Sequence, residues 1–221
     1  MIAALILIIP VGLIAKQPDL GTSILVLAAG VYVIFFAGLS WKIMMGLAVA
    51  GVAAMPLLWV SMHDYQRQRV LTLIDPTADP LGKGFHIIQS IIAVGSGGFF
   101  GKGWMQGTQT HLEFIPERTT DFILAVYAEE FGLFGVGILM LLYLAIILRG
   151  LTIAATGAST FGRLLAGSIT LSFFTYCFVN IGMVIGILPV VGMTLPLFSY
   201  GGSSLITVML GIGLLLNVHL R

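Results

Sequence analysis

The sequence predicts an all-α protein, a polytopic transmembrane helical bundle with a large loop outside the membrane. Its residues are 58% hydrophobic and 9% charged, whereas about a quarter of the residues in a soluble domain are charged. Several apolar runs reach roughly 18 residues, and about 20 residues at a rise of 1.5 Å cross the ~30 Å hydrocarbon layer. The third observation is that residues 63–121 hold six of the nine acidic residues, five of the ten basic residues and three of the four histidines. We therefore expect one membrane domain, 1–221, with its chemistry on the loop 63–121.

The apolar runs predict about six helices. The first run, Met1–Ala15, is shorter than a full span and lacks the basic residues that begin a signal peptide. We interpret it as the end of a transmembrane helix that begins outside this chain, so that the chain is N-terminally truncated. A removable signal sequence is the alternative. The other five runs are Leu20–Gly38, Ile43–Met62, Phe131–Leu148, Leu164–Leu188 and Ser203–Val218.

Alternating helices predict which loops share a side of the membrane. One side receives the loops 16–19, 63–121 and 189–202. The opposite side receives short segments with four cations and no acidic residue: Lys42, Arg149, Arg163 and Arg221. Cytoplasmic loops carry an excess of Lys and Arg, so the ionisable loop is expected to face outward.

Three segments of this loop have local structural signals. Asp75–Pro80 predicts a turn, because each proline fixes its own φ and disfavours helix at the residue before it. His86–Val94 places polar and apolar residues at helical spacing, which predicts a short amphipathic helix at the membrane surface. Gly95–Gly103 has five glycines in nine residues, and we expect a flexible turn there.

The last loop is predicted to be a re-entrant element lining an outer cavity. Pro189 and Pro196 break helices, and the pair Gly201–Gly202 permits left-handed backbone. Non-helical backbone near membrane depth persists only where protein or a watery cavity satisfies its polar groups. Ser199 and Ser203 have no histidine nearby in sequence, so we interpret them as turn residues rather than nucleophiles.

Asp121 is the candidate reactive group, because it closes the ionisable loop at the start of an apolar helix. Thr119 or Thr120 is placed to cap the first turn, and the helix macrodipole would favour an ionised carboxylate. Glu113, Glu117 and Arg118 lie close in sequence, and carboxylates with a cation beside a membrane cavity fit proton transfer. The alternative is that Asp121 only stabilises the helix terminus and its neighbours form a solvated loop face.

Glu129 and Glu130 lie about 12 to 14 Å further along the same helix. Consecutive helical residues point about 100° apart, so these two carboxylates cannot share a face. An ionisable side chain inside a transmembrane helix usually faces a cavity or a partner. Because Phe131–Leu148 could span the bilayer by itself, the alternative is that both glutamates lie at the interface.

The composition also excludes several function classes. The basic residues are too scattered to follow a nucleic-acid backbone, so no nucleic acid partner is expected. Cys177 is the single cysteine and lies in an apolar run, which favours a packing role over a metal ligand or nucleophile. The sequence has no strong metal-ligand spacing, so no metal site is assigned.

Three stretches give the sequence a specific resemblance. The run from Asn180 to Ser204 resembles the signature of the SEDS family, the RodA/FtsW/SpoVE proteins of bacterial wall synthesis. Gln17–Thr22 is similar to the start of a middle helix of this family. The loop from His63–Arg69 through Asp75 to Leu112–Asp121 resembles its large extracytoplasmic loop and is closest to that of RodA. Family members have about ten transmembrane helices, so the resemblance implies that this chain is the C-terminal part of a ten-helix fold.

The resemblance implies a peptidoglycan glycosyltransferase of the bacterial inner membrane. Such an enzyme polymerises lipid II, an undecaprenyl-pyrophosphoryl disaccharide-peptide, with a class B penicillin-binding protein as partner, in contact with membrane lipid. The family's catalytic aspartate falls on Asp121, its loop glutamate on Glu113 and the acid of its Gln-Pro-Asp element on Asp19. Seven motif positions have an expected structural role: Pro189, Gly192, Pro196, Ser199, Tyr200, Gly201 and Gly202.

The implied reaction requires a base for the acceptor 4-hydroxyl and positive charge for the departing pyrophosphate. We expect Asp121 to be the base, and the candidate cations are Arg118, Lys102 and Lys16. No cofactor is predicted, although a divalent cation held by carboxylates could do the same work as these cations. Two alternatives stay open: a lipid II transporter, and a non-catalytic scaffold for the penicillin-binding protein.

Overall fold

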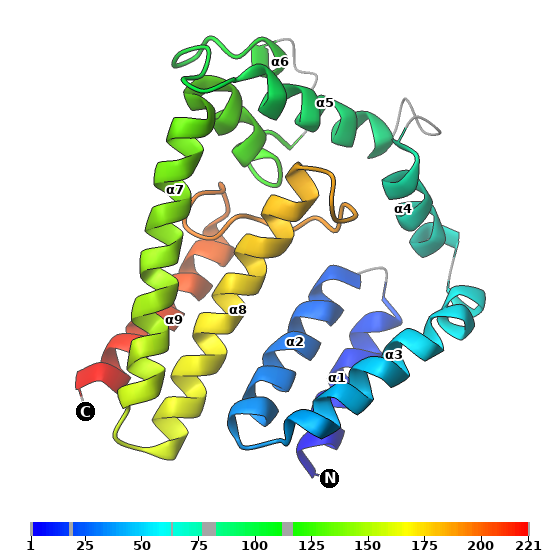
Figure 1. Cartoon of the computed structure of the whole chain (residues 1–221), viewed down its shortest axis with the longest axis vertical. Coiled ribbons are helices and arrows are strands. Elements are labelled where there is room, and N and C mark those ends of the chain that lie inside the picture. The colour runs from blue at the N-terminus through cyan, green and yellow to red at the C-terminus, as the bar shows by residue number, and fades with distance from the viewer. Residues whose placement is uncertain (1, 18–19, 63, 77–82, 112–116, 221) are drawn as a thin grey trace.

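The structure, a computed structural model, describes residues 2–17, 20–62, 64–76, 83–111 and 117–220 (Figure 1). Across these ranges the chain forms helices and no strands, which confirms the predicted all-α fold. The helices are α1 (Ile2–Ala15), α2 (Leu20–Phe36), α3 (Trp41–Ser61), α4 (Asp64–Ile74), α5 (Lys83–Ser96), α6 (Thr108–His111), α7 (Ile123–Thr156), α8 (Thr160–Val184) and α9 (Gly202–Leu220).

Figure 1 shows two groups of helices that are joined across one end of the molecule. α1 and α2 pack side by side, and α2 also packs against α8. α7, α8 and α9 form the second group, and α5 lies across its end in contact with α7 and α8. The α2–α3 and α7–α8 turns lie at the opposite end, where Figure 1 also places the two termini. The helices therefore alternate in direction as the sequence predicts.

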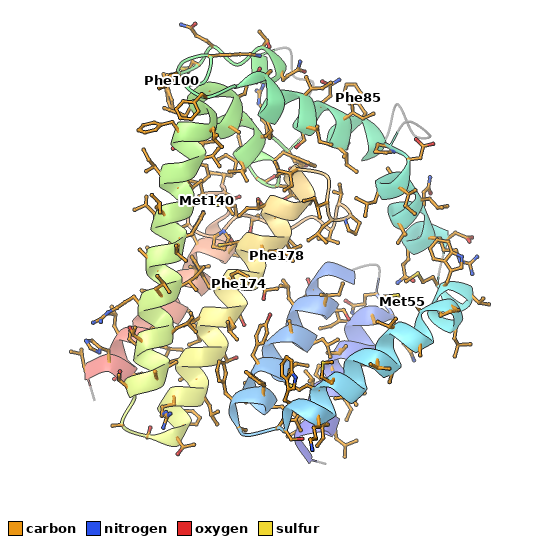
Figure 2. The ribbon with its side chains drawn as sticks, viewed as in Figure 1. Met55, Phe85, Phe100, Met140, Phe174 and Phe178 are labelled. Atoms are coloured by element: carbon orange, nitrogen blue, oxygen red, sulfur yellow. The ribbon has the colours of Figure 1, made fainter. Side chains whose placement is uncertain are left out.

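Three of the described helices are long and apolar enough to cross a membrane, namely α7 with 34 residues, α8 with 25 and α9 with 19. The apolar stretches of α1, α2 and α3 are shorter. The six predicted apolar segments are all helical, and three of them reach the length of a full span. Phe174 and Phe178, one turn apart on α8, stack with ring centroids 5.8 Å apart (Figure 2).

One helix includes residues before its apolar run, and another ends early. α7 begins at Ile123, close after Asp121, so it includes both glutamates that precede the apolar run, as predicted. α8 ends at Val184 rather than Leu188. Gly186 adopts φ +74°, and the carbonyl of Gly182 accepts hydrogen bonds from the N–H groups of Ile187 (2.8 Å) and Leu188 (3.0 Å). This C-terminal turn satisfies a helix carbonyl and ends the helix.

The helix α4 is absent from the sequence prediction. Most of its side chains are polar or charged, so it has little of the apolar periodicity that identifies a helix. Its Arg67 guanidinium donates to the carbonyls of Trp59 (3.0 Å) and Val60 (2.6 Å). These carbonyls belong to the last turn of α3, where backbone acceptors have no helical partner. α4 therefore caps the helix that precedes it.

The predicted amphipathic helix is present as α5, although it is longer than His86–Val94. Ile87, Ser90 and Ala93 follow one another at a spacing of three residues and are buried, so this stripe faces α7 and α8. The Ser90 hydroxyl donates to the carbonyl of Val184 at 2.6 Å. Packing against the ends of two helices, rather than a membrane surface alone, accounts for the buried stripe.

The glycine-rich segment 97–103 is not the flexible turn that the sequence predicts, because it packs into a break in α7. Gly132 has φ +65° and ψ −166°, which interrupts the helix. An unbroken helix would bond the N–H groups of Leu133 and Phe134 to the carbonyls of Glu129 and Glu130. The glycine-rich segment supplies partners for all four groups.

Four backbone hydrogen bonds make this exchange. Leu133 and Phe134 donate to the carbonyls of the segment, and the carbonyls of α7 accept from its N–H groups: Leu133 to Gly98 (2.9 Å), Phe134 to Phe99 (3.0 Å), Lys102 to Glu129 (3.0 Å) and Gly103 to Glu130 (3.0 Å). A Cβ added at Gly101 would lie 2.1 Å from the carbonyl oxygen of Glu130. The glycines therefore allow the backbone of the segment 97–103 to lie close to the backbone of α7. Figure 2 places the 79% exposed ring of Phe100 at this end of α7.

Substitution of Gly101 tests this packing. Gly101→Ala should lower the free energy of unfolding by about 2 kcal/mol or more, because Gly101 has φ +80° and a side chain there meets backbone rather than a movable group. Gly137→Ala on the same α7 is the matched control, since a Cβ there meets nothing within 4 Å. Thermal unfolding in one detergent measures both, and an equal midpoint for the two variants would contradict the close packing of segment 97–103.

Candidate active site

Asp121 lies in a turn that precedes α7 rather than in the helix itself. The residue at the N-cap position is Phe122, and it makes no side-chain capping bond. The prediction that Thr119 or Thr120 caps the helix is therefore wrong. The Thr120 hydroxyl instead donates to the Glu117 carboxylate at 2.8 Å, and the carbonyl of Glu117 accepts from the N–H groups of Thr120 (3.1 Å) and Phe122 (3.2 Å). A local turn thus replaces the expected cap.

Three consecutive carbonyl oxygens in this turn accept hydrogen bonds from distant parts of the chain. The bonds run from the Tyr200 N–H to Thr119 (2.9 Å), from the Ser199 hydroxyl to Thr120 (2.6 Å) and from the Asn180 carboxamide to Asp121 (2.9 Å). The donors belong to α8 and to the segment 185–201 that joins α8 to α9. The turn is therefore held from outside rather than by helical hydrogen bonds.

The segment 185–201 is itself fixed by its polar groups, as expected for non-helical backbone near membrane depth. The Ser199 hydroxyl accepts from the Leu195 N–H at 2.7 Å, so both of its hydrogen-bonding functions are used structurally. The hydroxyl of Tyr143 on α7 donates to the carbonyl of Pro196 at 2.8 Å. Pro196 also borders an apolar cavity of about 390 Å³ between α7, α8 and α9.

The left-handed backbone of this segment is not where the sequence predicts it. Gly201 and Gly202 do not have positive φ, whereas Gly186 (+74°), Gly192 (+76°) and Leu197 (+62°) do. Gly202 begins α9, and the Gly201 carbonyl accepts from the Leu205 N–H at 3.0 Å. The pair therefore starts a helix. Gly192 instead lies beside Asp121, since a Cβ built on it would be 3.6 Å from Oδ2 of the carboxyl group.

The protonation of Asp121 also differs from the expectation. Burial raises the pKa of the Asp121 carboxyl above its ordinary value, and the negative charge of Glu117 raises this pKa further. The sequence predicted that the helix macrodipole would favour the ionised form. Asp121 lies outside the first helical turn and half-buried, so desolvation outweighs the dipole. A carboxyl group with a raised pKa holds a proton more strongly, which suits a general base.

Glu129 forms a second polar cluster, at the break in α7. Its carboxylate is fully buried and lies 2.7 Å from the ammonium of Lys102. The Thr108 hydroxyl (3.0 Å) and the Gln109 N–H (3.1 Å) donate to the same carboxylate oxygen. Glu129 therefore faces a partner, which is the first of the two predicted possibilities. Glu130 is also buried, with 8% of its surface exposed.

The other predicted residues fall in different places. Lys102, a candidate substrate cation, donates to Glu129 and to the Thr108 hydroxyl at 2.8 Å. Arg118 is half-buried in the turn before Asp121, and Lys16 is exposed at the end of α1. Asp19 and Glu113 lie outside the described residues. The structure thus brings Asp121 together with Gly192, Ser199 and Tyr200.

The part of the chain that the structure describes contains no group of three or more His, Cys, Asp or Glu side chains that could hold a metal ion. Cys177 is a buried free thiol in the main apolar core, which confirms its predicted packing role. A divalent cation stays a prediction of the sequence.

The fold and the site together define a polytopic membrane protein in which the segment 185–201 and α8 hold the turn that carries a carboxyl group at the end of a large polar loop. The model of the FtsW/RodA/SpoVE family, described as "Cell cycle protein", matches residues 1–221. The chain belongs to this family, as its resemblance to SEDS proteins predicted.

Curated relatives agree with this membership. The chain is 60% identical to peptidoglycan glycosyltransferase MrdB of Escherichia coli (strain K12) over 220 residues, which cover 99% of the chain and 59% of the relative. It is 40% identical to MrdB of Helicobacter pylori over 211 residues, which cover 95% and 54%. The chain thus spans a little more than half the length of these relatives. Its membrane-length helices and these relatives identify a multi-pass protein of the bacterial inner membrane.

Two solved structures have the same fold. One, described as "Structural coordination of polymerization and crosslinking by a peptidoglycan synthase complex", has a TM-score of 0.80 and 39% identity, covering 98% of this chain and 60% of that chain. The crystal structure of the Thermus thermophilus rod shape determining protein RodA has a TM-score of 0.65 and 31% identity, covering 99% and 55%.

Removing either member of the buried ion pair should have unequal effects. Lys102→Met should lower the free energy of unfolding by about 3–5 kcal/mol, because the Glu129 carboxylate stays buried without its counter-ion. Glu129→Gln should cost about 1–2 kcal/mol, since the Lys102 side chain is 27% exposed and its ammonium can reach water. Thermal unfolding of both variants in the same detergent tests the asymmetry. Equal losses would show that burial of Glu129 does not dominate the pair.

Proposed function

We propose that the complete protein is a peptidoglycan glycosyltransferase that polymerises lipid II into glycan strands during cell elongation and the maintenance of rod shape. The names of the relatives that are 60% and 40% identical support this activity. The observation that carries the proposal is the half-buried Asp121 carboxyl group, which lies just before the N-terminus of α7 and beside Gly192 and has a pKa raised by burial. We further propose a class B penicillin-binding protein as partner, since a similar fold occurs in a peptidoglycan synthase complex.

In the proposed reaction the 4-hydroxyl of one sugar attacks the anomeric carbon of another, whose bond to the polyprenyl pyrophosphate breaks. Asp121 takes the hydroxyl proton, and the pyrophosphate leaves with the bonding electrons. A base is most effective when its pKa lies near the working pH. The raised pKa of Asp121 therefore makes this carboxylate a stronger base than an exposed aspartate.

The departing pyrophosphate needs positive charge. Arg118 is the best placed of the candidate cations, because it lies in the same turn as Asp121. Lys102 is engaged by Glu129, so its proposed part in binding requires the ammonium to contact substrate with its remaining N–H. Lys16, Asp19 and Glu113 stay proposed substrate-binding residues, and a divalent cation stays a proposed addition to this charge.

Asp121→Asn tests the proposed base. The variant should lose glycan polymerisation by at least about 100-fold, because the amide cannot accept the proton. The assay follows glycan strands formed from labelled lipid II. It uses the chain in place of the matching 220 residues of the Escherichia coli relative, purified with a class B penicillin-binding protein. Asp64→Asn is the matched control, since Asp64 is an exposed acid of the same polar loop.

The same preparations separate the alternative functions. A transporter would move lipid II across a vesicle membrane without forming glycosidic bonds, and a scaffold would bind its partner without either activity. Polymer formation by Asp121→Asn at the level of the unsubstituted protein would refute the assignment of the base.

The pH dependence tests the electrostatics of the site. Activity should fall as the pH drops through the pKa of Asp121, because the protonated carboxyl group cannot act as a base. Glu117→Gln removes the negative charge that raises this pKa. The pH at which the variant loses activity on the acidic side of its pH–rate profile should therefore be lower. The measurement is the initial rate of polymerisation across pH, with buffers of constant ionic strength. An unchanged acidic side of the pH–rate profile would show that Glu117 does not influence the pKa of the base.

A further inference from the structure

Asn180 occupies a central position that the proposed chemistry does not explain. It lies in α8 and is 0% exposed. Its Nδ2 donates to the carbonyl of Asp121 at 2.9 Å and to the carbonyl of Met193 at 2.5 Å. These carbonyls belong to two separate segments, the turn before α7 and the segment 185–201. One side chain thus joins both segments to α8.

The two partners fix the orientation of the carboxamide. Both are carbonyl oxygens, and only the nitrogen of the amide can donate to them. The Oδ1 atom must therefore point away from both, and it has no hydrogen-bond partner among the described residues. A buried polar atom of this kind is uncommon in packed interiors. An apolar side chain at this position would leave no buried oxygen without a partner. The two hydrogen bonds that the amide donates therefore account for an asparagine here.

The Asn180 contacts control the immediate surroundings of the reactive group. Ser199 and Tyr200 hold the two peptide groups before Asp121, whereas Asn180 holds the carbonyl of Asp121 itself. It also holds Met193, the residue after Gly192, whose Cβ would lie 3.6 Å from Oδ2 of Asp121. Asn180 therefore sets the separation between the carboxyl group and the backbone beside it.

We propose that Asn180 is a positioning residue for Asp121, which it holds at a fixed distance from the segment 185–201 through two hydrogen bonds to backbone carbonyls. The inference rests on the proposed function, since positioning matters only if Asp121 takes part in a reaction. Misplacement of a catalytic group by about 1 Å can reduce a rate on the order of 100-fold.

Other side chains cannot replace these two bonds. Leucine is similar in size but leaves both carbonyls without a donor. An ionised aspartate presents only acceptors to two acceptors, and a protonated aspartate donates to one of them. Glutamine adds a methylene group to a side chain that has no exposed surface. The position is therefore specific for asparagine.

The experiment compares Asn180→Leu with Tyr32→Phe, a matched control that removes one hydrogen bond from the same α8. The Tyr32 hydroxyl bonds to Thr175 at 2.6 Å, between α2 and α8. Both variants are measured as initial rates of polymerisation at several lipid II concentrations, in the preparation described above. Asn180→Leu should lower kcat about 100-fold with little change in KM, whereas Tyr32→Phe should leave kcat within about twofold.

Asn180→Asp supplies a second readout that a loss of stability alone would not produce. Its carboxyl group can donate to one carbonyl while protonated and to neither when ionised, so residual activity should fall as pH rises. Activity that depends on Asp121 rises with pH instead, and Glu117 is the charged neighbour that acts on it. The proposal predicts that this variant adds a fall at higher pH, as the introduced carboxyl group ionises, to the rise that ionisation of Asp121 produces. The unsubstituted protein should show the rise alone.

The outcomes separate this inference from the proposed function. If Asp121→Asn is inactive but Asn180→Leu keeps the kcat of the unsubstituted protein, Asn180 does not position the base. An Asn180→Asp profile that coincides with the unsubstituted one would overturn the inference in the same way. If Asp121→Asn polymerises lipid II normally, the proposed role of Asp121 is wrong, and the inference about Asn180 is wrong with it.

Discussion

The arrangement of the candidate site depends on three consecutive carbonyl oxygens, those of Thr119, Thr120 and Asp121, which accept hydrogen bonds from α8 and the segment 185–201. Backbone polar groups near membrane depth must find partners within the protein. Here the turn before α7 accepts hydrogen bonds from the segment 185–201, so the polar groups of both segments gain partners and the two are ordered together. These hydrogen bonds fix the position of Asp121.

The same principle operates at the break in α7. Gly132 interrupts the helix, and the glycine-rich segment 97–103 replaces the lost hydrogen bonds with its own backbone groups. The Glu129–Lys102 ion pair lies at this junction and ties the side chains of the two elements together. The polar loop is therefore not independent of the helices below it, because part of it completes a transmembrane helix.

Burial raises the pKa of the Asp121 carboxyl group, which a position near a helix terminus alone would not do. A carboxyl group in the first turn of a helix would be stabilised in its ionised form by the macrodipole. Asp121 stands before that turn, beside Glu117 and half-buried under neighbouring backbone, so its pKa is raised instead. A displacement of two residues in the start of α7 therefore leaves Asp121 where burial, rather than the helix macrodipole, governs its pKa.

The sequence by itself determined the all-α class, the six apolar helices and the amphipathic α5, because hydrophobicity and periodicity are local properties. It did not determine that Lys102 pairs with Glu129, that Gly192 rather than Gly201–Gly202 is left-handed, or that Asn180 holds the Asp121 carbonyl. Those features join residues that are far apart in the chain, and the tertiary structure alone decides which buried polar groups meet. Partners for buried donors and acceptors are a property of packing, whereas the tendency to enter the membrane is a property of composition.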